Sequence, residues 1–310
     1  MQQTIKAPVS FTGQGLHSGK PATLTIRPAK AGYGIWFRRT DLSEAEGLLP
    51  ARWNAVERTA LCTRLVNTSG ASVSTIEHVM AALAGCGIGN ALVEIDGPEV
   101  PILDGSAAPF VRGILARGLT AQAAPSRAIR VLRPVEVRNG EAVARLLPAE
   151  QMEIAFHIDF PDAAIGRQNR ELVIKNGAFV RELSDSRTFC RQADVEMMQA
   201  NGLALGGTLD NAVVVDGARV LSPSGLRHAD EPVRHKMLDA LGDLALAGAP
   251  LLARYEGIRA GHSLTNTLLR ELFSDRRNYR IQSCDEATAA RLPGVGVTPA
   301  EVPAEVSAVA

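Results

Sequence analysis

The sequence predicts an α+β protein made of two similar domains. Its 310 residues suggest two domains more readily than one. Short alternating or β-branched segments, typical of strands, stand between amphipathic segments with the period of a helix. This order of strands and helices occurs twice in outline. The segment TAQAAPSR at 120–127 separates the two copies and is the best candidate for a linker.

The first half, 1–122, is predicted to hold strands at 22–28 and 91–97. A helix is predicted from Ser74, where Ile76, Val79, Met80 and Leu83 recur at helical spacing. A second short helix is expected at 109–118.

The second half, 128–284, is expected to follow the same order. Strands are predicted first, then a helix near 194–202, more strands, a two-sided helix and a last helix. The final stretch, rich in Ala, Pro and Val, reads as a frayed, flexible tail. The segments are 128–138, 152–160 and 208–222 for strands, 231–244 and 266–274 for the later helices, and 285–310 for the tail.

Composition excludes several classes of protein. The 33 basic and 33 acidic residues cancel, so nothing in the charge favours a nucleic-acid partner. The longest apolar runs fall short of the ~20 residues that cross a bilayer, so no stable membrane insertion is expected. Four cysteines without a CxxC pair, and a start without secretory character, favour a reducing compartment, the cytoplasm.

The helix at 231–244 carries the strongest chemical signal. With His235 at zero on a helical wheel, Asp239 falls at about 40° and Asp243 at about 80°, on the side opposite the apolar residues. Lys236 flanks this ridge. The ridge has two interpretations, a solvated polar face or part of a metal site. A metal site needs a further ligand, for which His78 is the best candidate.

Glu77 directly precedes His78 and also has two interpretations. A glutamate beside a metal ligand suits a general base. Alternatively, Ser74-x-x-Glu77 is a capping box, in which the glutamate bonds back to the amide of the N-cap residue. Both interpretations predict a helix that starts at Ser74, and the sequence alone leaves them open.

Among the other histidines, His262 in the polar segment RAGHSLTN is the first candidate for a functional role, with His17 in GQGLHSGK similar to it. The glycine-containing loops GQGLHSG and GLALGGTLD do not match a P-loop or a dinucleotide fingerprint, so they are weak phosphate motifs.

Seven motifs, in the same order, resemble the UDP-3-O-acyl-N-acetylglucosamine deacetylase family, which catalyses the committed step of lipid A synthesis. The resemblance runs from about residue 2 to residue 275. The motifs are GLHSGK, STIEHVMAALAG, EVPILDGSAAPF, SRTF, GLALGGTLDNAVVVD, DEPVRHKMLDALGDL and AGHSLTN.

The resemblance implies a zinc-dependent deacetylase. Each domain would be a layer of helices on a sheet, and the two would pack helix layer to helix layer with the active site at their interface. Its metal ligands, for Zn²⁺ or else Fe²⁺, would be His78 together with His235 and Asp239, on a helix at 232–247.

The same resemblance assigns catalytic roles. Glu77 would be the general base, and Thr188 would help to stabilise the oxyanion. His262, held protonated by Asp243, would donate a proton to the departing amine, and Lys236 would contact substrate.

The resemblance also implies a βαβ insert, at about 188–214, that forms an apolar passage for the acyl chain. Cys190, Arg191 and Gln192 depart from the family pattern in this insert. The expected partner is a UDP-linked acylated amino-sugar substrate, acted on by a monomer. The residues that map to the lining of the passage are Phe189, Val195, Met198, Ala204, Thr208 and Val214.

Overall fold

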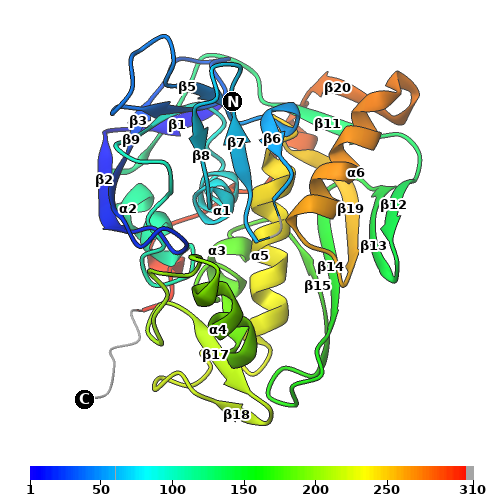
Figure 1. Cartoon of the computed structure of the whole chain (residues 1–310). Coiled ribbons are helices and arrows are strands. Elements are labelled where there is room, and N and C mark those ends of the chain that lie inside the picture. Colours follow the sequence, from blue (N-terminus) through cyan, green and yellow to red (C-terminus); the bar gives the residue numbers. More distant parts are fainter. Residues whose placement is uncertain (60, 305–310) are drawn as a thin grey trace.

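The computed structural model describes residues 1–59 and 61–304 (Figure 1). A five-stranded sheet lies in the first half of the chain and a seven-stranded sheet in the second. Helices α1 (Glu77–Gly85) and α5 (Glu231–Ala245) lie between them, in the centre of the molecule. The prediction of an α+β fold is confirmed.

The sheet of the first half has the strand order β2-β3-β9-β4-β5. Its central strand, β9, pairs antiparallel with β3 and parallel with β4. Alternation in β3 turns Leu24 and Ile26 into the core and the residues between them outward. The strands span Val9–Gln14 (β2), Pro21–Pro28 (β3), Ile35–Arg39 (β4), Leu48–Pro50 (β5) and Ala91–Ile95 (β9).

Five strands of the second sheet repeat this arrangement in the order β12-β13-β19-β14-β15. The central β19 again pairs antiparallel with one neighbour, β13, and parallel with the other, β14. The two halves therefore share one topology, as predicted. The strands span Arg127–Val131 (β11), Val135–Asn139 (β12), Ala142–Pro148 (β13), Met152–Asp159 (β14), Arg167–Val173 (β15), Leu251–Ile258 (β19) and Tyr279–Ser283 (β20).

Each half carries an insertion between the fifth strand of this order and its central helix. Each insertion contacts candidate site residues of the central helices, through Thr63 in the first half and Ser186 in the second. In the first half the insertion holds Trp53–Ala55 (η1), Val56–Glu57 (β6), Arg64–Val66 (β7) and Ser72–Val73 (β8). In the second it holds Ala178–Glu182 (α3), Phe189–Arg191 (β16), Gln192–Ala200 (α4), Val213–Asp216 (β17) and Arg219–Val220 (β18).

The remaining elements are short strands and helices. No helix in the described part of the chain has both the length and the apolar character to cross a bilayer. These elements are Gln3–Ile5 (β1), Ala108–Arg117 (α2), Leu119–Ala121 (β10), His262–Ser274 (α6), Arg276–Asn278 (η2), Glu286–Ala289 (α7) and Pro299–Glu301 (η3).

Two boundaries differ from the prediction. The single strand expected at 128–138 is two strands, β11 and β12, separated by a segment that contains Pro134, which has no amide hydrogen to donate to a sheet. The linker expected at 120–127 is shorter, because Thr120 pairs with Thr4 between β10 and β1. The division into domains at 122–128 remains a prediction.

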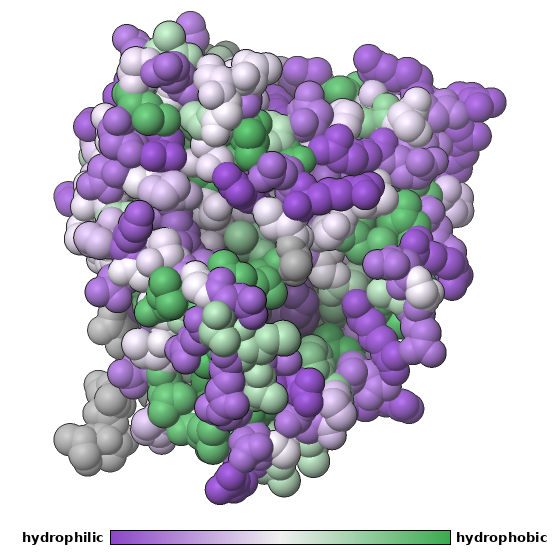
Figure 2. All heavy atoms as spheres, viewed as in Figure 1, coloured by the Kyte–Doolittle hydropathy of each residue, from purple (hydrophilic) through white to green (hydrophobic). Residues whose placement is uncertain are grey.

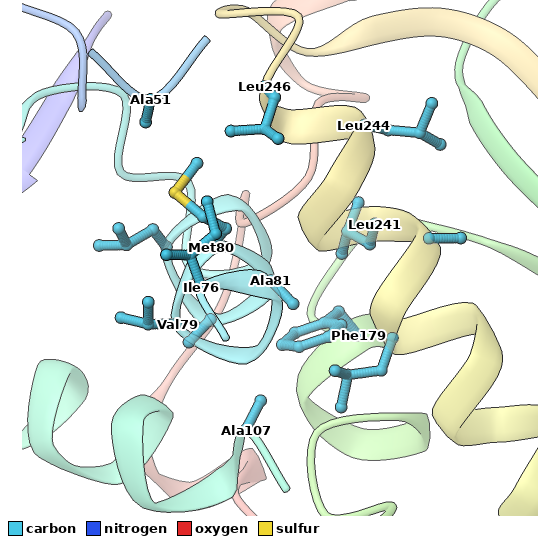
Figure 3. Close-up of a cluster of buried hydrophobic side chains, with 14 of the residues drawn as sticks. Ala51, Ile76, Val79, Met80, Ala81, Ala107, Phe179, Leu241, Leu244 and Leu246 are labelled. Carbon is cyan, nitrogen blue, oxygen red and sulfur yellow. The ribbon is translucent and has the colours of Figure 1, made fainter. Parts of the chain in front are cut away.

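The central helices approach closely at a glycine of α5, and an aromatic ring fills the space beside a glycine of α1. A Cβ on Gly242 of α5 would lie 2.1 Å from the carbonyl oxygen of Glu77 at the start of α1, so the two backbones nearly touch. Gly85, at the other end of α1, leaves space that the ring of Phe179 fills. Figure 3 shows Phe179 between the two helices. Both contacts hold the two halves together, and the one at Gly242 lies next to the candidate site.

Helix α1 begins three residues later than predicted. Ser74 forms a bridge with Glu99 and its amide donates to the carbonyl oxygen of Pro98, so it does not cap a helix. Thr75 then has φ of 59°, a left-handed conformation that separates the bridge from the helix. The capping box is therefore wrong, and Glu77 is the first residue of the helix.

The stretch expected as a frayed tail packs on the molecule over much of its length. Leu292 is buried with Ala128 and Leu252 of the second half. A Cβ on Gly294 would lie 2.2 Å from the amide nitrogen of Gly87 in the first half. The prediction of a tail is therefore wrong for this segment, because its small and apolar residues contact both halves. Residues 305–310 lie outside the described part of the chain.

Candidate metal and catalytic site

The three residues expected to bind metal come together at the contact of α1 and α5. His78 is the second residue of α1, and His235 and Asp239 lie one turn apart on α5. One potential ligand atom from each lies within 4.8 Å of the others, and all three side chains are buried. The helical spacing placed two of them on one face, and the close contact of the helices adds the third from the other half.

The donor atoms fit a bound cation. Asp239 Oδ1 is buried and accepts no hydrogen bond from the part of the chain that the structure describes. It lies 3.3 Å from His235 Nε2 and 3.7 Å from His78 Nε2. An orphaned buried oxygen costs about 1–3 kcal/mol, and a cation would remove that cost. His235 Nδ1 donates to the carbonyl oxygen of Ser186 at 3.0 Å, which turns the lone pair of Nε2 toward Asp239.

Electrostatics favour the protonation states that bind metal. Burial, followed by the neighbouring His235, lowers the pKa of His78 to about 3, so its imidazole is neutral. Burial alone would raise the pKa of Asp239. His235, when it carries a proton, and the Lys236 ammonium outweigh burial and hold that pKa below its usual range. Burial lowers the pKa of His235 as well and favours its neutral form. Neutral imidazoles and an ionised carboxylate are the forms that coordinate a metal ion.

Glu77 lies beside this cluster in a position suited to a base. Its Oε2 accepts a hydrogen bond from the backbone amide of Thr63 at 3.0 Å, and its Oε1 lies 3.9 Å from His262 Nε2. Burial is the largest influence on Glu77 and raises its pKa to about 7. The charges of Asp239 and Asp243 act in the same direction, and that of His262 opposes them. A carboxyl with this pKa can accept a proton near neutral pH.

His262 and Asp243 form a hydrogen-bonded pair on the other side of the site. His262 Nδ1 donates to Asp243 Oδ2 at 2.8 Å. Burial lowers the pKa of His262, but Asp243, Asp239 and Glu77 together raise it to about 9. The imidazolium is therefore available as a proton donor. The structure places His262 at the first position of α6, rather than in the loop expected before a helix at 266–274.

Thr63 is a site residue that the sequence did not reveal. Its backbone amide donates a hydrogen bond to Glu77, and its hydroxyl donates one to Asp243 Oδ1. One residue of the first insertion thus contacts both a carboxylate of α1 and a carboxylate of α5. Thr63 lies in an irregular segment between β6 and β7, where no periodic pattern indicates which way a side chain faces.

The other expected catalytic residues lie nearby with simpler contacts. Lys236 Nζ donates to Asp239 Oδ2 at 2.7 Å. Thr188 is half-buried, and its backbone bonds to Gly105 and Val213. Within the described residues its hydroxyl has no hydrogen-bond partner. The ring of Phe189, the next residue, lies 6.3 Å from that of His235 between centroids.

The segment expected to form the acyl passage is a βαβ unit. Strands β16 and β17 pair in parallel, with α4 between them. Figure 2 shows hydrophobic side chains at the surface around this unit. Met197 and Leu205 are exposed apolar residues of the unit. The six expected lining residues are distributed as follows: Ala204 and Val214 are buried, Phe189, Val195 and Met198 are half-buried, and Thr208 is exposed.

Arg191 and Gln192, which depart from the family pattern, have polar partners outside the apolar face, and Cys190 is a small neutral residue. The Arg191 guanidinium pairs with Asp162 in the turn between β14 and β15. Gln192 Nε2 donates to Glu196 Oε1 at 2.9 Å, one turn along α4. Burial raises the pKa of the Cys190 thiol to about 11, so the thiol is neutral. These contacts keep the Arg191 charge away from the apolar face.

The two glycine-containing loops contact each other instead of forming separate phosphate cradles. The amides of Leu205 and Gly206 donate to the carbonyl oxygens of His17 and Leu16, respectively. The amides of His17 and Ser18 are occupied by the carboxylate of Glu99, each at 2.8 Å. These contacts join the insert of the second half to the first half.

Comparisons with known proteins agree on one family. Residues 2–274 match the family described as UDP-3-O-acyl N-acetylglycosamine deacetylase. A UDP-3-O-acyl-N-acetylglucosamine deacetylase of Phenylobacterium zucineum is 49% identical over 288 residues, 93% of this chain and 98% of that protein. A protein of the same name from an Anaeromyxobacter species is 49% identical over 90% of this chain and 91% of its own length. Another from a Shewanella species is 46% identical over 92% of this chain and 94% of its own length.

Proposed function

Because the chain belongs to the UDP-3-O-acyl-N-acetylglucosamine deacetylase family, we propose that it hydrolyses the N-acetyl group of UDP-3-O-[(3R)-3-hydroxyacyl]-N-acetylglucosamine. The products are acetate and the free amine, in the committed step of lipid A biosynthesis. The observation that carries this proposal is the buried group of His78, His235 and Asp239, flanked by Glu77 and His262.

We assign a catalytic Zn²⁺, or alternatively Fe²⁺, to His78, His235 and Asp239. Two histidines and one carboxylate, with a position left open, are typical of a catalytic rather than a structural zinc site. When bound, the metal lowers the pKa of a water ligand toward about 7 and polarises the carbonyl of the acetamide. The unpartnered Asp239 Oδ1 supports this assignment.

Glu77 is the proposed general base. It accepts a proton from the attacking water, and its pKa of about 7 gives it both an ionised population and sufficient basicity at neutral pH. The amide of Thr63 holds its other oxygen, so Oε1 is the atom free to take the proton. Attack on the acetamide carbon then generates an oxyanion.

Lys236 and Thr188 are proposed to act on that oxyanion. The Lys236 ammonium is fixed by Asp239 next to the metal ligands and supplies a positive charge. The Thr188 hydroxyl supplies a neutral donor. Donors held in place before the reaction stabilise charge as it develops, without reorganising.

His262 is the proposed general acid. Its Nδ1 is committed to Asp243, so Nε2 is the atom that faces Glu77 and Asp239, at 3.9 and 3.8 Å. Donation of the Nε2 proton to the nitrogen of the amide lets the carbon–nitrogen bond break with a neutral amine as the leaving group. Asp243 stabilises the imidazolium until that transfer.

The βαβ unit of 188–214 is proposed to bind the 3-hydroxyacyl chain. Two observations support this: the ring of Phe189, in the first strand of the unit, lies 6.3 Å from that of His235, and the unit has exposed apolar side chains, among them Met197 and Leu205. We also propose a cytoplasmic, monomeric enzyme. The four free cysteines agree with a reducing compartment, and sedimentation velocity tests the oligomeric state.

The substrate experiment compares two acceptors under the same conditions. Purified enzyme should deacetylate the 3-O-acylated nucleotide sugar much faster than UDP-N-acetylglucosamine, because only the former can use the apolar passage. Glu77→Ala, purified in parallel, controls for a contaminating activity. Equal rates for the two acceptors would contradict the substrate assignment. Elemental analysis after anaerobic purification identifies the metal.

A further inference from the structure

A cavity lies between the two halves, away from the proposed catalytic residues. Its volume is about 500 Å³, within the ~300–1,000 Å³ typical of small-molecule sites. Met80 and Leu83 of α1 and Leu241 and Leu244 of α5 contribute to an apolar wall. No ligand or catalytic residue of the site described above lines it, and neither does any residue of the βαβ unit at 188–214.

Among the described residues, the lining of the cavity includes two guanidinium groups and no carboxylate. Arg52 and Arg127 are the charged side chains of its lining. Neither forms an ion pair within the described residues, and Arg52 has only a long contact, 3.5 Å, to the carbonyl oxygen of Ala247. Burial, and next the charge of Arg127, lower the pKa of Arg52, so the two cations lie within electrostatic reach of each other. An anion between them would remove this repulsion.

A third polar side chain, that of Gln3, also lines the cavity. Its Oε1 is buried, and no donor among the described residues bonds to it. A side-chain amide can present either its oxygen or its nitrogen after a rotation about χ3, so Gln3 can bond to a hydroxyl or to an anionic oxygen. Unsatisfied polar groups beside an apolar wall are typical of a binding site.

We propose that this cavity binds a single-chain anionic amphiphile, with the chain against α1 and α5 and a carboxylate or phosphate between Arg52 and Arg127. The apolar wall excludes a wholly polar anion, and the unpaired cations disfavour a neutral lipid. Because α1 and α5 also carry the proposed metal ligands, an occupant would contact both central helices from the side opposite the active site.

Four ten-carbon compounds test the charge requirement. Decanoate and decyl phosphate, below their micellar concentrations, are titrated into the full-length, metal-loaded protein by calorimetry, with decanol and decyltrimethylammonium as neutral and cationic counterparts. Both anions, or one of them, should bind at least 10-fold more tightly than decanol. The tighter anion identifies a free acyl carboxylate or a phosphate headgroup as the source. Equal binding of decanol and both anions would overturn the proposal.

Variants assign the binding to this cavity. Arg52→Gln and Arg127→Gln should each weaken the binding of the anion about 10-fold or more. Arg130→Gln is the matched control, because Arg130 lies on the same strand as Arg127 but pairs with Glu150 and does not line the cavity. Unchanged affinity in both Arg52→Gln and Arg127→Gln would overturn the proposal. Gly89→Leu places a side chain where a Cβ meets no atom within 4 Å, and it should reduce binding by filling space.

Mapping separates this cavity from the proposed acyl passage, which is also apolar. A photoreactive diazirine analogue of decanoate, followed by peptide mass spectrometry, should label the segments around Leu83 and Leu244. Labelling confined to 189–214 would place the ligand in the passage and overturn the proposal. Because no catalytic turnover is measured, this outcome does not depend on the deacetylase assignment.

Discussion

At the scale of single residues, the site depends on two buried groups with shifted protonation equilibria. Glu77 and His262 lie 3.9 Å apart, and each has other contacts that fix its remaining polar atom. The pKa of Glu77 is raised to about 7 and that of His262 to about 9. Between pH 7 and pH 9, Glu77 is therefore mainly ionised and can act as a base, and His262 is mainly protonated and can act as an acid. Amide hydrolysis requires this pair of states.

Replacing Glu77 should separate catalysis from metal binding. Glu77→Ala should retain the bound metal and lose about 10²–10⁴-fold in kcat, the usual contribution of a general base. His78→Ala should lose the metal as well, since it removes a proposed ligand. Metal content by elemental analysis and kcat on the acylated substrate provide the two readouts. Full activity of Glu77→Ala would show that another group is the base.

His262 should control the alkaline side of the pH profile. The proton donor exists below the pKa of His262 and is lost as the pH rises through about 9, so activity should fall there. On the acidic side, activity should rise with pH as Glu77 ionises. The midpoint of this rise should lie below pH 7, because a bound cation favours the carboxylate form of Glu77. In His262→Ala the alkaline fall should disappear from the kcat profile. If it persists, a different group is responsible for it.

At the scale of elements, the distance between α1 and α5 determines whether the proposed ligands meet. Gly242 allows the approach, because any side chain there would collide with the backbone at Glu77. The same contact orients α1 so that His78 faces His235, with ring centroids 5.0 Å apart.

Gly242→Ala should therefore destabilise the protein and impair the site together. The clash should cost about 1–3 kcal/mol, more than the roughly 1 kcal/mol that alanine gains in a helix. The temperature of thermal unfolding and the metal affinity should both decline. Gly89→Ala, where the added methyl meets no atom within 4 Å, is the control and should change neither. Normal metal affinity in Gly242→Ala would mean that the helices can separate without affecting the ligands.

A buried ion pair fixes the segment before Thr188 to the start of α5. Arg187 and Glu231 are 1% and 0% exposed, and Glu231 accepts bonds from the backbone amide of Arg187 as well as from its guanidinium. Arg187 also donates to Ser224 and Gly225. The βαβ unit is thereby attached to the helix that carries His235 and Asp239.

Arg187→Met should be strongly destabilising, by about 3–5 kcal/mol, because it leaves the Glu231 charge buried with backbone amides as donors but without an opposite charge. Chemical denaturation measures the loss. The double variant Arg187→Met/Glu231→Gln should recover part of it, since the uncompensated charge is then absent. A single variant as stable as the double one would show that the ion pair contributes little.

At the scale of the whole molecule, the central helices of the two halves pack against each other, and the proposed metal ligands come from both halves. A cation held by His78 from one half and by His235 and Asp239 from the other would link the halves. The segment around Leu292 and Gly294 links them again elsewhere.

Removing the metal should consequently lower the thermal stability of the whole protein. A ligand that binds only the folded state stabilises it in proportion to its concentration relative to its Kd. Treatment with a chelator should lower Tm, and added Zn²⁺ should restore it. His78→Ala should show no response to chelator, and it serves as the control. A chelator effect of equal size in His78→Ala would indicate that the metal binds elsewhere.

The sequence by itself determined what local periodicity can determine. It placed His235, Asp239 and Asp243 on one face of a helix, because residues three to four apart share a face wherever that helix lies. It predicted some strands of each half in the same way, among them β3, β9 and β14. Motifs that span the chain added the expectation that His78, more than 150 residues earlier, belongs to the same site.

Only the tertiary structure decided how those faces meet. The start of α1 at Glu77, the role of Thr63 between Glu77 and Asp243, and the packing of Leu292 all depend on neighbours distant in sequence. A local pattern contains no information on such neighbours. The contact of Gly242 with the backbone at Glu77 is of the same kind, and through it two separately predictable helices form a single site.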